Sequence, residues 1–87
     1  MILEIIYVDE YSKELPPGDL GRESSIIATD AALSAIMSQV PLIGDMVQQQ
    51  LGDYPIYIVM WRLKTLNKNT GNITWLIGCK EGNVIKP

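Results

Sequence analysis

The chain has 87 residues, a mass of 9.7 kDa and a formal charge of −3. A chain of this length forms one domain over residues 1–87 and buries only about 60 to 65% of the surface that its unfolded form exposes. Its content of 47% hydrophobic residues excludes intrinsic disorder, and the absence of His beside one Cys excludes His-based catalysis, His metal sites and intrachain disulfides. We therefore expect a globular protein that is not an enzyme and carries no cofactor or metal.

Charge is divided unevenly along the chain. Residues 1–53 carry nine acidic and two basic side chains, a net charge of −7, whereas residues 54–87 carry five basic and one acidic, a net charge of +4. The acidic total argues against binding of nucleic-acid polymers, which needs many Lys and Arg side chains opposite phosphates. The split favours attraction between the two halves, within a chain or between copies. The alternative is that the basic half attracts a small anion.

The first predicted element is a strand over Ile2–Val8, where β-branched, aromatic and aliphatic residues are interrupted only by Glu4. Residues 9–25 are polar and contain the turn signal Pro16-Pro17-Gly18-Asp19, so we expect a long polar loop. Loops of this length in a small domain are usually functional or mobile. A short extended segment over 25–28 is expected to follow.

A helical pattern comes next. Thr29 and Asp30 are both good N-caps, and one apolar stripe follows at helical spacing, made of Leu33, Ile36, Met37, Val40, Ile43, Val47 and Leu51. Pro41 removes a backbone donor and disfavours helical geometry at the residue before it. We therefore expect either one kinked helix or two short helices, over 30–39 and 41–50.

The rest of the chain has the pattern of a β-hairpin. The apolar segments Ile56–Leu66 and 73–79 flank the polar, Gly-containing loop 67–72. A further turn at 80–83 would let Val84 and Ile85 return as a short edge strand. The element order predicts an α+β fold, with a small antiparallel-leaning sheet of three to four strands that includes the C-terminal β-hairpin. One kinked helix or two short helices cover one face.

Alternation along the hairpin predicts which side chains share a face. If Leu66 pairs with Ile73, then Lys64 lies opposite Trp75, Arg62 opposite Ile77 and Met60 opposite Cys79. Arg62, Lys64 and Trp75 then lie together, either as a cation–π contact that stabilises the hairpin or as a platform for a planar anionic ligand. A register slip of one residue would move Trp75 to the opposite face.

Self-association is the expectation that follows from the apolar side chains on both faces of the hairpin. One short helical layer covers only one face of a small sheet, so the second face is expected to meet another copy of the chain.

Few residues have the chemistry of a reactive site. Cys79 has no His to activate it and is expected to be a buried, inert thiol. Asp9 and Glu10 are adjacent, so their side chains point apart and are expected to be solvated. The acidic residues of the 9–19 segment match no EF-hand spacing, which argues against a cation site.

The segment 18–25 is the strongest binding candidate. Its two glycines allow close backbone approach, Ser24 and Ser25 offer hydroxyls, and Arg22 offers a forked cation for phosphate or carboxylate. It lacks the Gly-Lys-Ser/Thr of a phosphate-binding loop, so an ordinary polar loop is the competing interpretation.

These observations favour a non-catalytic, homo-oligomeric binding protein that captures a small anionic, nucleotide-like ligand for sequestration or sensing. The predicted ligand-binding residues are Arg22, Ser24, Ser25, Arg62, Lys64 and Trp75. The alternative function is a protein–protein interaction module, such as an inhibitor or an assembly subunit, that uses apolar hairpin surface and free strand edges.

The segment Met1-Ile2-Leu3-Glu4 lacks the pattern of a signal peptide, and no apolar run is long enough to span a membrane, so we expect a cytoplasmic protein.

Overall fold

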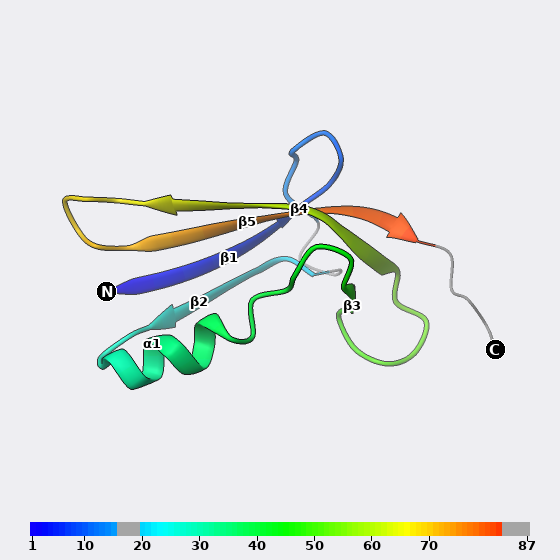
Figure 1. The fold of residues 1–87 in the computed structure, drawn as a ribbon. Coiled ribbons are helices and arrows are strands. Elements are labelled where there is room, and N and C mark those ends of the chain that lie inside the picture. The colour runs from blue at the N-terminus through cyan, green and yellow to red at the C-terminus, as the bar shows by residue number, and fades with distance from the viewer. Residues whose placement is uncertain (16–19, 83–87) are drawn as a thin grey trace.

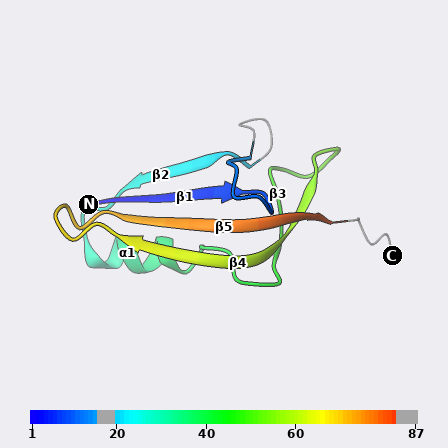
Figure 2. The same cartoon turned by 90° about the horizontal axis from the view of Figure 1, so that it is seen from above.

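The computed structural model describes residues 1–15 and 20–82. A five-stranded sheet makes up most of it, and one short helix lies against one face of that sheet (Figure 1). The elements in chain order are β1 (Ile2–Val8), β2 (Arg22–Ile26), α1 (Asp30–Met37), β3 (Met46–Gln48), β4 (Ile56–Leu66) and β5 (Ile73–Gly82). In space the strands follow the order β2-β1-β5-β4-β3, and β2, β1, β5 and β4 are seen side by side from above in Figure 2.

The predicted α+β fold, an antiparallel-leaning sheet of three to four strands, is wrong in the size and the type of the sheet. The described residues form five strands, and the sheet is mixed because β1 and β5 run parallel at its centre, with Leu3 opposite Ile73. The other three neighbouring pairs are antiparallel. A parallel partner is reached through a long crossover, so the local pattern of β1 carries no signal of it.

The prediction of a kinked helix or two short helices is also wrong, because only the first half of the predicted segment is helical. α1 ends at Met37, and Met46–Gln48 forms β3 in place of a second helix over 41–50. Between them the N–H of Gly44 donates to the carbonyl of Val59 at 2.8 Å, and the N–H of Val59 donates to the carbonyl of Asp45 at 2.9 Å. Pairing with β4 therefore satisfies the backbone that a second helix would have satisfied internally.

The polar segment after β1 is shorter than the predicted loop over 9–25. Arg22–Ile26 forms β2, which pairs antiparallel with β1 so that Ile2 lies opposite Ile26 and Ile6 opposite Arg22. The turn signal at 16–19 lies outside the described residues, as do Val84 and Ile85 of the predicted edge strand.

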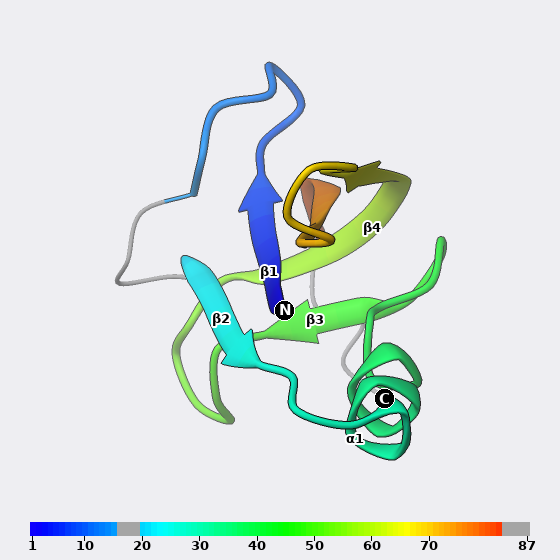
Figure 3. The ribbon, with the colours of Figure 1, turned by 90° about the vertical axis from the view of Figure 1, so that its left-hand side faces the viewer.

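The sheet is curled, and we call the face that α1 covers the inner face and the opposite one the outer face. Figure 3 shows the curl, with β2 and β3 drawn toward each other on the side of α1 although they end the strand order. The core lies on the inner face. Its buried side chains come mainly from β1, β4 and β5 and include Leu3, Ile5, Tyr7, Val59, Ile73, Ile77 and Cys79.

The predicted hairpin register is confirmed over part of β4. Leu66 lies opposite Ile73, Lys64 opposite Trp75 and Arg62 opposite Ile77. The register then shifts between Val59 and Trp61, so Cys79 lies opposite Val59 instead of Met60. The extra residue of this β-bulge reverses the alternation, which places Val59 on the inner face with Arg62 and Lys64.

Candidate functional site

The six predicted ligand-binding residues lie on both faces of the sheet. Arg22 and Ser24 are on the outer face of β2, because they pair with Ile6 and Glu4, whose side chains point away from the core. Ser25 pairs with Leu3 and is on the inner face. The remaining three, Arg62, Lys64 and Trp75, are on the inner face of the β4–β5 hairpin, and β1 and β5 separate β2 from β4. Within one chain these residues do not form one site.

Arg22 is already occupied by acidic side chains. Its Nε lies 3.1 Å from Oε1 of Glu14 and its Nη1 lies 3.2 Å from Oε2 of Glu4. The hydrogen bond and the charge of Glu14 raise the pKa of Arg22 further. The two carboxylates stand where the oxygens of a bound anion would stand, and through them Arg22 contacts β1 and the segment between β1 and β2.

Arg62 and Trp75 form the cation–π contact that the hairpin register predicts. The Cζ atom of Arg62 lies 4.4 Å from the centre of the Trp75 ring. The indole Nε1–H donates to Sδ of Met37 at 3.3 Å, which ties the ring to α1. The Nε of Arg62 is buried and has no hydrogen-bond partner among the described residues. No carboxylate pairs with this guanidinium among the described residues, so its charge is not neutralised by an ion pair there.

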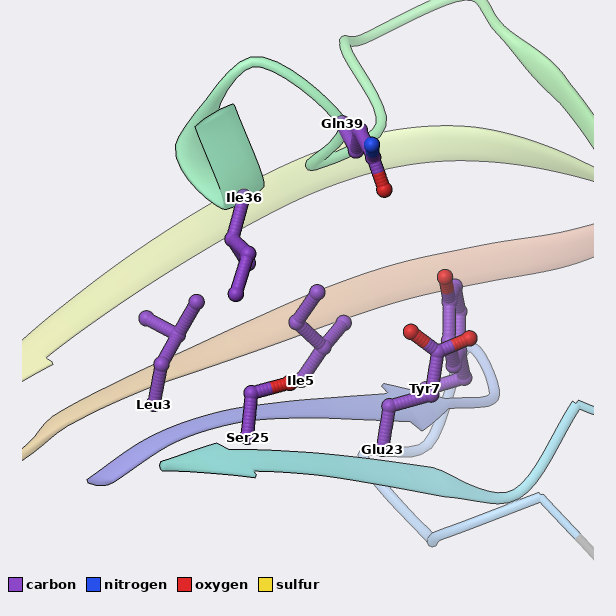
Figure 4. A pocket seen from close by; sticks show the side chains of 7 residues that line it. All are labelled: Leu3, Ile5, Tyr7, Glu23, Ser25, Ile36 and Gln39. Carbon is purple, nitrogen blue, oxygen red and sulfur yellow. The ribbon is translucent and has the colours of Figure 1, made fainter. Parts of the chain in front are cut away.

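Two adjoining cavities lie on the inner face, and we call them together the groove. The first has a volume of about 230 Å³ and is lined by Leu3, Ile5, Tyr7, Glu23, Ser25, Ile36 and Gln39 (Figure 4). The second has a volume of about 400 Å³ and extends toward residues 46–49 of β3 and the turn after it. Both are lined by Tyr7, Glu23 and Gln39, so they meet at these three polar side chains.

The groove has apolar side chains in its wall, but most of its accessible surface is polar. In Figure 4 the side chains of β1 and β2 point into the cavity from one side, and Ile36 and Gln39 point toward them from the other. Burial raises the pKa of Tyr7 to about 12, and the negative charge of Glu23 adds to the rise. The phenol is therefore a neutral hydrogen-bond donor at physiological pH, beside a carboxylate that only accepts.

The sequence interpretation missed Tyr7, Glu23 and Gln39 because they come from three separate segments. The signal that was available is the alternation of Glu23, Ser25 and Ile27, which indicates a strand with one face turned to the core. Ile27 is indeed buried. The predicted loop over 9–25 contains Glu23 and Ser25, and a loop prediction assigns no face to their side chains.

Cys79 is buried, as predicted. Burial raises the pKa of Cys79 to about 11, and its Sγ lies 3.5 Å from the carbonyl oxygen of Ile77. The thiol is therefore protonated at neutral pH and is a poor nucleophile. In residues 1–15 and 20–82, no three acidic or thiol side chains come close enough to hold a metal ion.

No helix in the described part of the chain has the length and apolar character needed to cross a membrane. Comparison with protein-family models, with curated proteins and with solved structures returns no match to this chain. The geometry of the groove and of the hairpin is therefore the basis for inferring a function.

Proposed function

We propose that the protein is a non-catalytic binding protein that holds a small molecule in the groove. The observation that carries this proposal is the meeting of two cavities at Tyr7, Glu23 and Gln39. The larger one, at about 400 Å³, is within the range of roughly 300 to 1,000 Å³ that is usual for ligand pockets.

The polar groups of the groove favour a neutral or cationic ligand with N–H or O–H donors. Glu23 accepts hydrogen bonds and carries a negative charge, and no Lys or Arg side chain from residues 1–15 and 20–82 lines either cavity. A phosphate beside Glu23 would be repelled by the charge of its carboxylate. The anionic, nucleotide-like ligand predicted from the sequence stays a prediction, and the residues that would serve it are Arg62, Lys64 and Trp75.

Self-association and a cytoplasmic location complete the proposal. Ile2, Ile26 and Leu63 are large apolar side chains that are exposed on the outer face, and a second copy would cover them. The cytoplasmic location is supported by the single Cys79, which is unpaired and buried.

The test is an NMR titration of ¹⁵N-labelled protein with a library of small neutral, cationic and anionic compounds. We expect saturable shifts at the amides of β2 and at Gln39 with neutral or cationic members. Ser25→Ala removes a hydroxyl from the groove and is expected to weaken binding about 2- to 10-fold, the value of one hydrogen bond.

Ser24→Ala is the matched control, because Ser24 is the neighbouring serine on the outer face. It is expected to leave binding unchanged. Equal effects of the two variants, or saturable shifts only around Arg62 and Lys64 with anionic compounds, would count against the groove. The second result would support the anionic ligand instead.

A further inference from the structure

We propose that the free edge of β4 is a docking site for an extended, acidic segment of another protein, which adds to the sheet as a further strand. β3 pairs with β4 only over Ile56, Tyr57 and Ile58, and the hydrogen bonds of Gly44 and Asp45 extend this contact to Val59. Beyond that residue no backbone hydrogen bond from the described segments reaches this side of β4. The edge from Trp61 to Leu66 is therefore available for pairing.

The hydrogen-bond pattern of the hairpin identifies which backbone groups face the edge. The N–H of Asn67 donates to the carbonyl of Asn72 at 2.9 Å and its carbonyl accepts from the N–H of Gly71 at 2.7 Å, so both backbone groups of Asn67 bond across the hairpin, as in a hydrogen-bonded pair. In an antiparallel ladder such pairs alternate, so residues 61, 63 and 65 bond to β5. Arg62, Lys64 and Leu66 therefore turn their N–H and C=O groups to the free edge.

Val59 gives an independent check on this assignment. Its N–H and C=O groups bond to Asp45 and Gly44, so an odd-numbered residue faces the edge before the bulge. The bulge between Val59 and Trp61 inserts one residue and reverses the alternation. Even-numbered residues are then expected to face the edge beyond it, in agreement with the pattern at the hairpin turn.

The side chains along the edge specify the chemistry of the partner. Arg62 and Lys64 are both on the inner face. The Nε of Arg62 is buried and lacks an acceptor, whereas Lys64 is exposed. No carboxylate pairs with either of them among the described residues. The outer face of the same edge carries Trp61 and Leu63, and the Leu63 side chain is 51% exposed. A strand in which acidic and apolar residues alternate would match both faces.

A second copy of this chain is a poorer occupant of the edge. Two β4 strands paired antiparallel about Leu63 would place Arg62 of each copy opposite Lys64 of the other, and like charges directly opposite are destabilising. The β2 edge of another copy offers only Glu23 as an acid on its inner face. The cationic pair thus disfavours self-pairing and selects an acidic strand from elsewhere.

The probe is a capped synthetic peptide with the repeating sequence Glu-Val-Glu-Val-Glu. One control peptide has Gln in place of each Glu, and another has the same composition with the alternation scrambled. Binding is followed by NMR, with hydrogen exchange of the β4 amides as a second readout. We expect saturable binding that weakens with salt, and new protection at the amides of Arg62, Lys64 and Leu66.

Two variants test the charges of the edge. Arg62→Gln and Lys64→Gln are each expected to weaken binding of the glutamate peptide by at least about fivefold, which corresponds to about 1 kcal/mol. Lys68→Gln in the hairpin turn removes an exposed charge away from the edge and is expected to have no effect. Leu66→Pro deletes one edge N–H without changing charge, and it is also expected to weaken binding.

Several results would overturn the proposal. One is equal binding of the Glu and Gln peptides, and another is equal binding of the scrambled control. New protection at residues 61, 63 and 65, or shifts confined to the groove, would mean that the peptide does not extend the sheet. Protection at the edge amides that rises with protein concentration in the absence of peptide would show that a second copy occupies the edge.

Discussion

Gly78 and Trp61 meet on the outer face, where the absence of a side chain on β5 lets the indole ring lie directly against the strand. A Cβ atom added at Gly78 would overlap Cε2 and Nε1 of the Trp61 ring. Glycine weakens the interior of a strand unless another group needs the space. Here the ring fills that space and covers backbone that a side chain would otherwise cover.

Gly78→Ala is expected to lower the free energy of unfolding by about 1 to 3 kcal/mol, because the ring or the strand has to move. In a Trp61→Ala background the overlap is gone, and the same substitution is expected to cost less than half as much. Urea denaturation of the four proteins in a double-mutant cycle measures both costs. Additive costs would show that the contact with Trp61 is not the reason for a glycine at this position.

How far single residues can be predicted from the sequence depends on the range of their contacts. The contact between Arg62 and Trp75 was predictable, because the loop over 67–72 fixes the register nearby. The pairing of Arg22 with Glu14 was not, because it exists only once the chain folds back on β1 to form β2. Local sequence patterns therefore predict a contact across a hairpin. They do not predict a contact that depends on a strand pairing the sequence does not indicate.

Among the elements, α1 has the clearest local cause. Thr29 is its N-cap, and Oγ1 of Thr29 accepts a hydrogen bond from the N–H of Ala32 at 3.1 Å. The helix has only eight residues, so this cap satisfies one of the few backbone donors that the first turn leaves free. Its half-buried side chains Leu33, Ile36 and Met37 pack on the core of the sheet.

Thr29→Ala is expected to lower the free energy of unfolding by about 1 kcal/mol, because the N–H of Ala32 loses its acceptor. Thr29→Asp keeps an acceptor and adds a favourable charge at the helix N-terminus, so its stability is expected to stay near that of the parent. Urea denaturation followed by far-UV circular dichroism compares the three proteins. A Thr29→Asp protein as unstable as Thr29→Ala would contradict the capping role.

The segment after α1 shows why the second predicted helix was wrong. Its apolar residues have helical spacing, yet Val40 and Pro41 are buried while Ile43 and Leu51 are exposed. Pro41 prevents α1 from continuing through it, although a helix that began at Pro41 would tolerate a proline in its first turn. Gly44 has φ of 93°, a conformation that glycine adopts without strain and that leads the chain into β3. The N–H and C=O groups of β4 that pair with this segment favour a strand over a second helix. The spacing of apolar residues within the segment carries no information about such partners.

For the molecule as a whole, the main question is what covers the outer face. α1 lies on the other side of the sheet in Figure 1, and the edge strands β2 and β3 curl toward that side. Exposed apolar side chains therefore remain on the outer face, and Ile26 is 85% exposed. Large exposed apolar residues that lie together on a sheet are typical of an interface.

We expect sedimentation at micromolar concentration to show a species larger than the 9.7 kDa chain. Ile26→Lys is expected to shift the protein toward monomer, because it places a charge on the outer face. Leu51→Lys is the matched control, since Leu51 is 95% exposed but lies in the segment between β3 and β4. A parent protein that sediments only as monomer would refute self-association, and equal effects of both variants would place the interface elsewhere.

The parallel pairing of β1 with β5 has a consequence for how the protein is made. The N–H of Ile2 bonds to Oδ1 of Asn72 across 70 positions of the chain, at the same end of the sheet where Leu3 meets Ile73. At a synthesis rate of about 5 to 20 residues per second, β1 is synthesised roughly 4 to 14 seconds before its central neighbour β5. During that interval an apolar strand has β2 on one side and an open edge on the other. Aggregation through the open edge of β1 is therefore expected to compete with the pairing of β1 and β5. Slower translation lengthens the interval in which this edge is open.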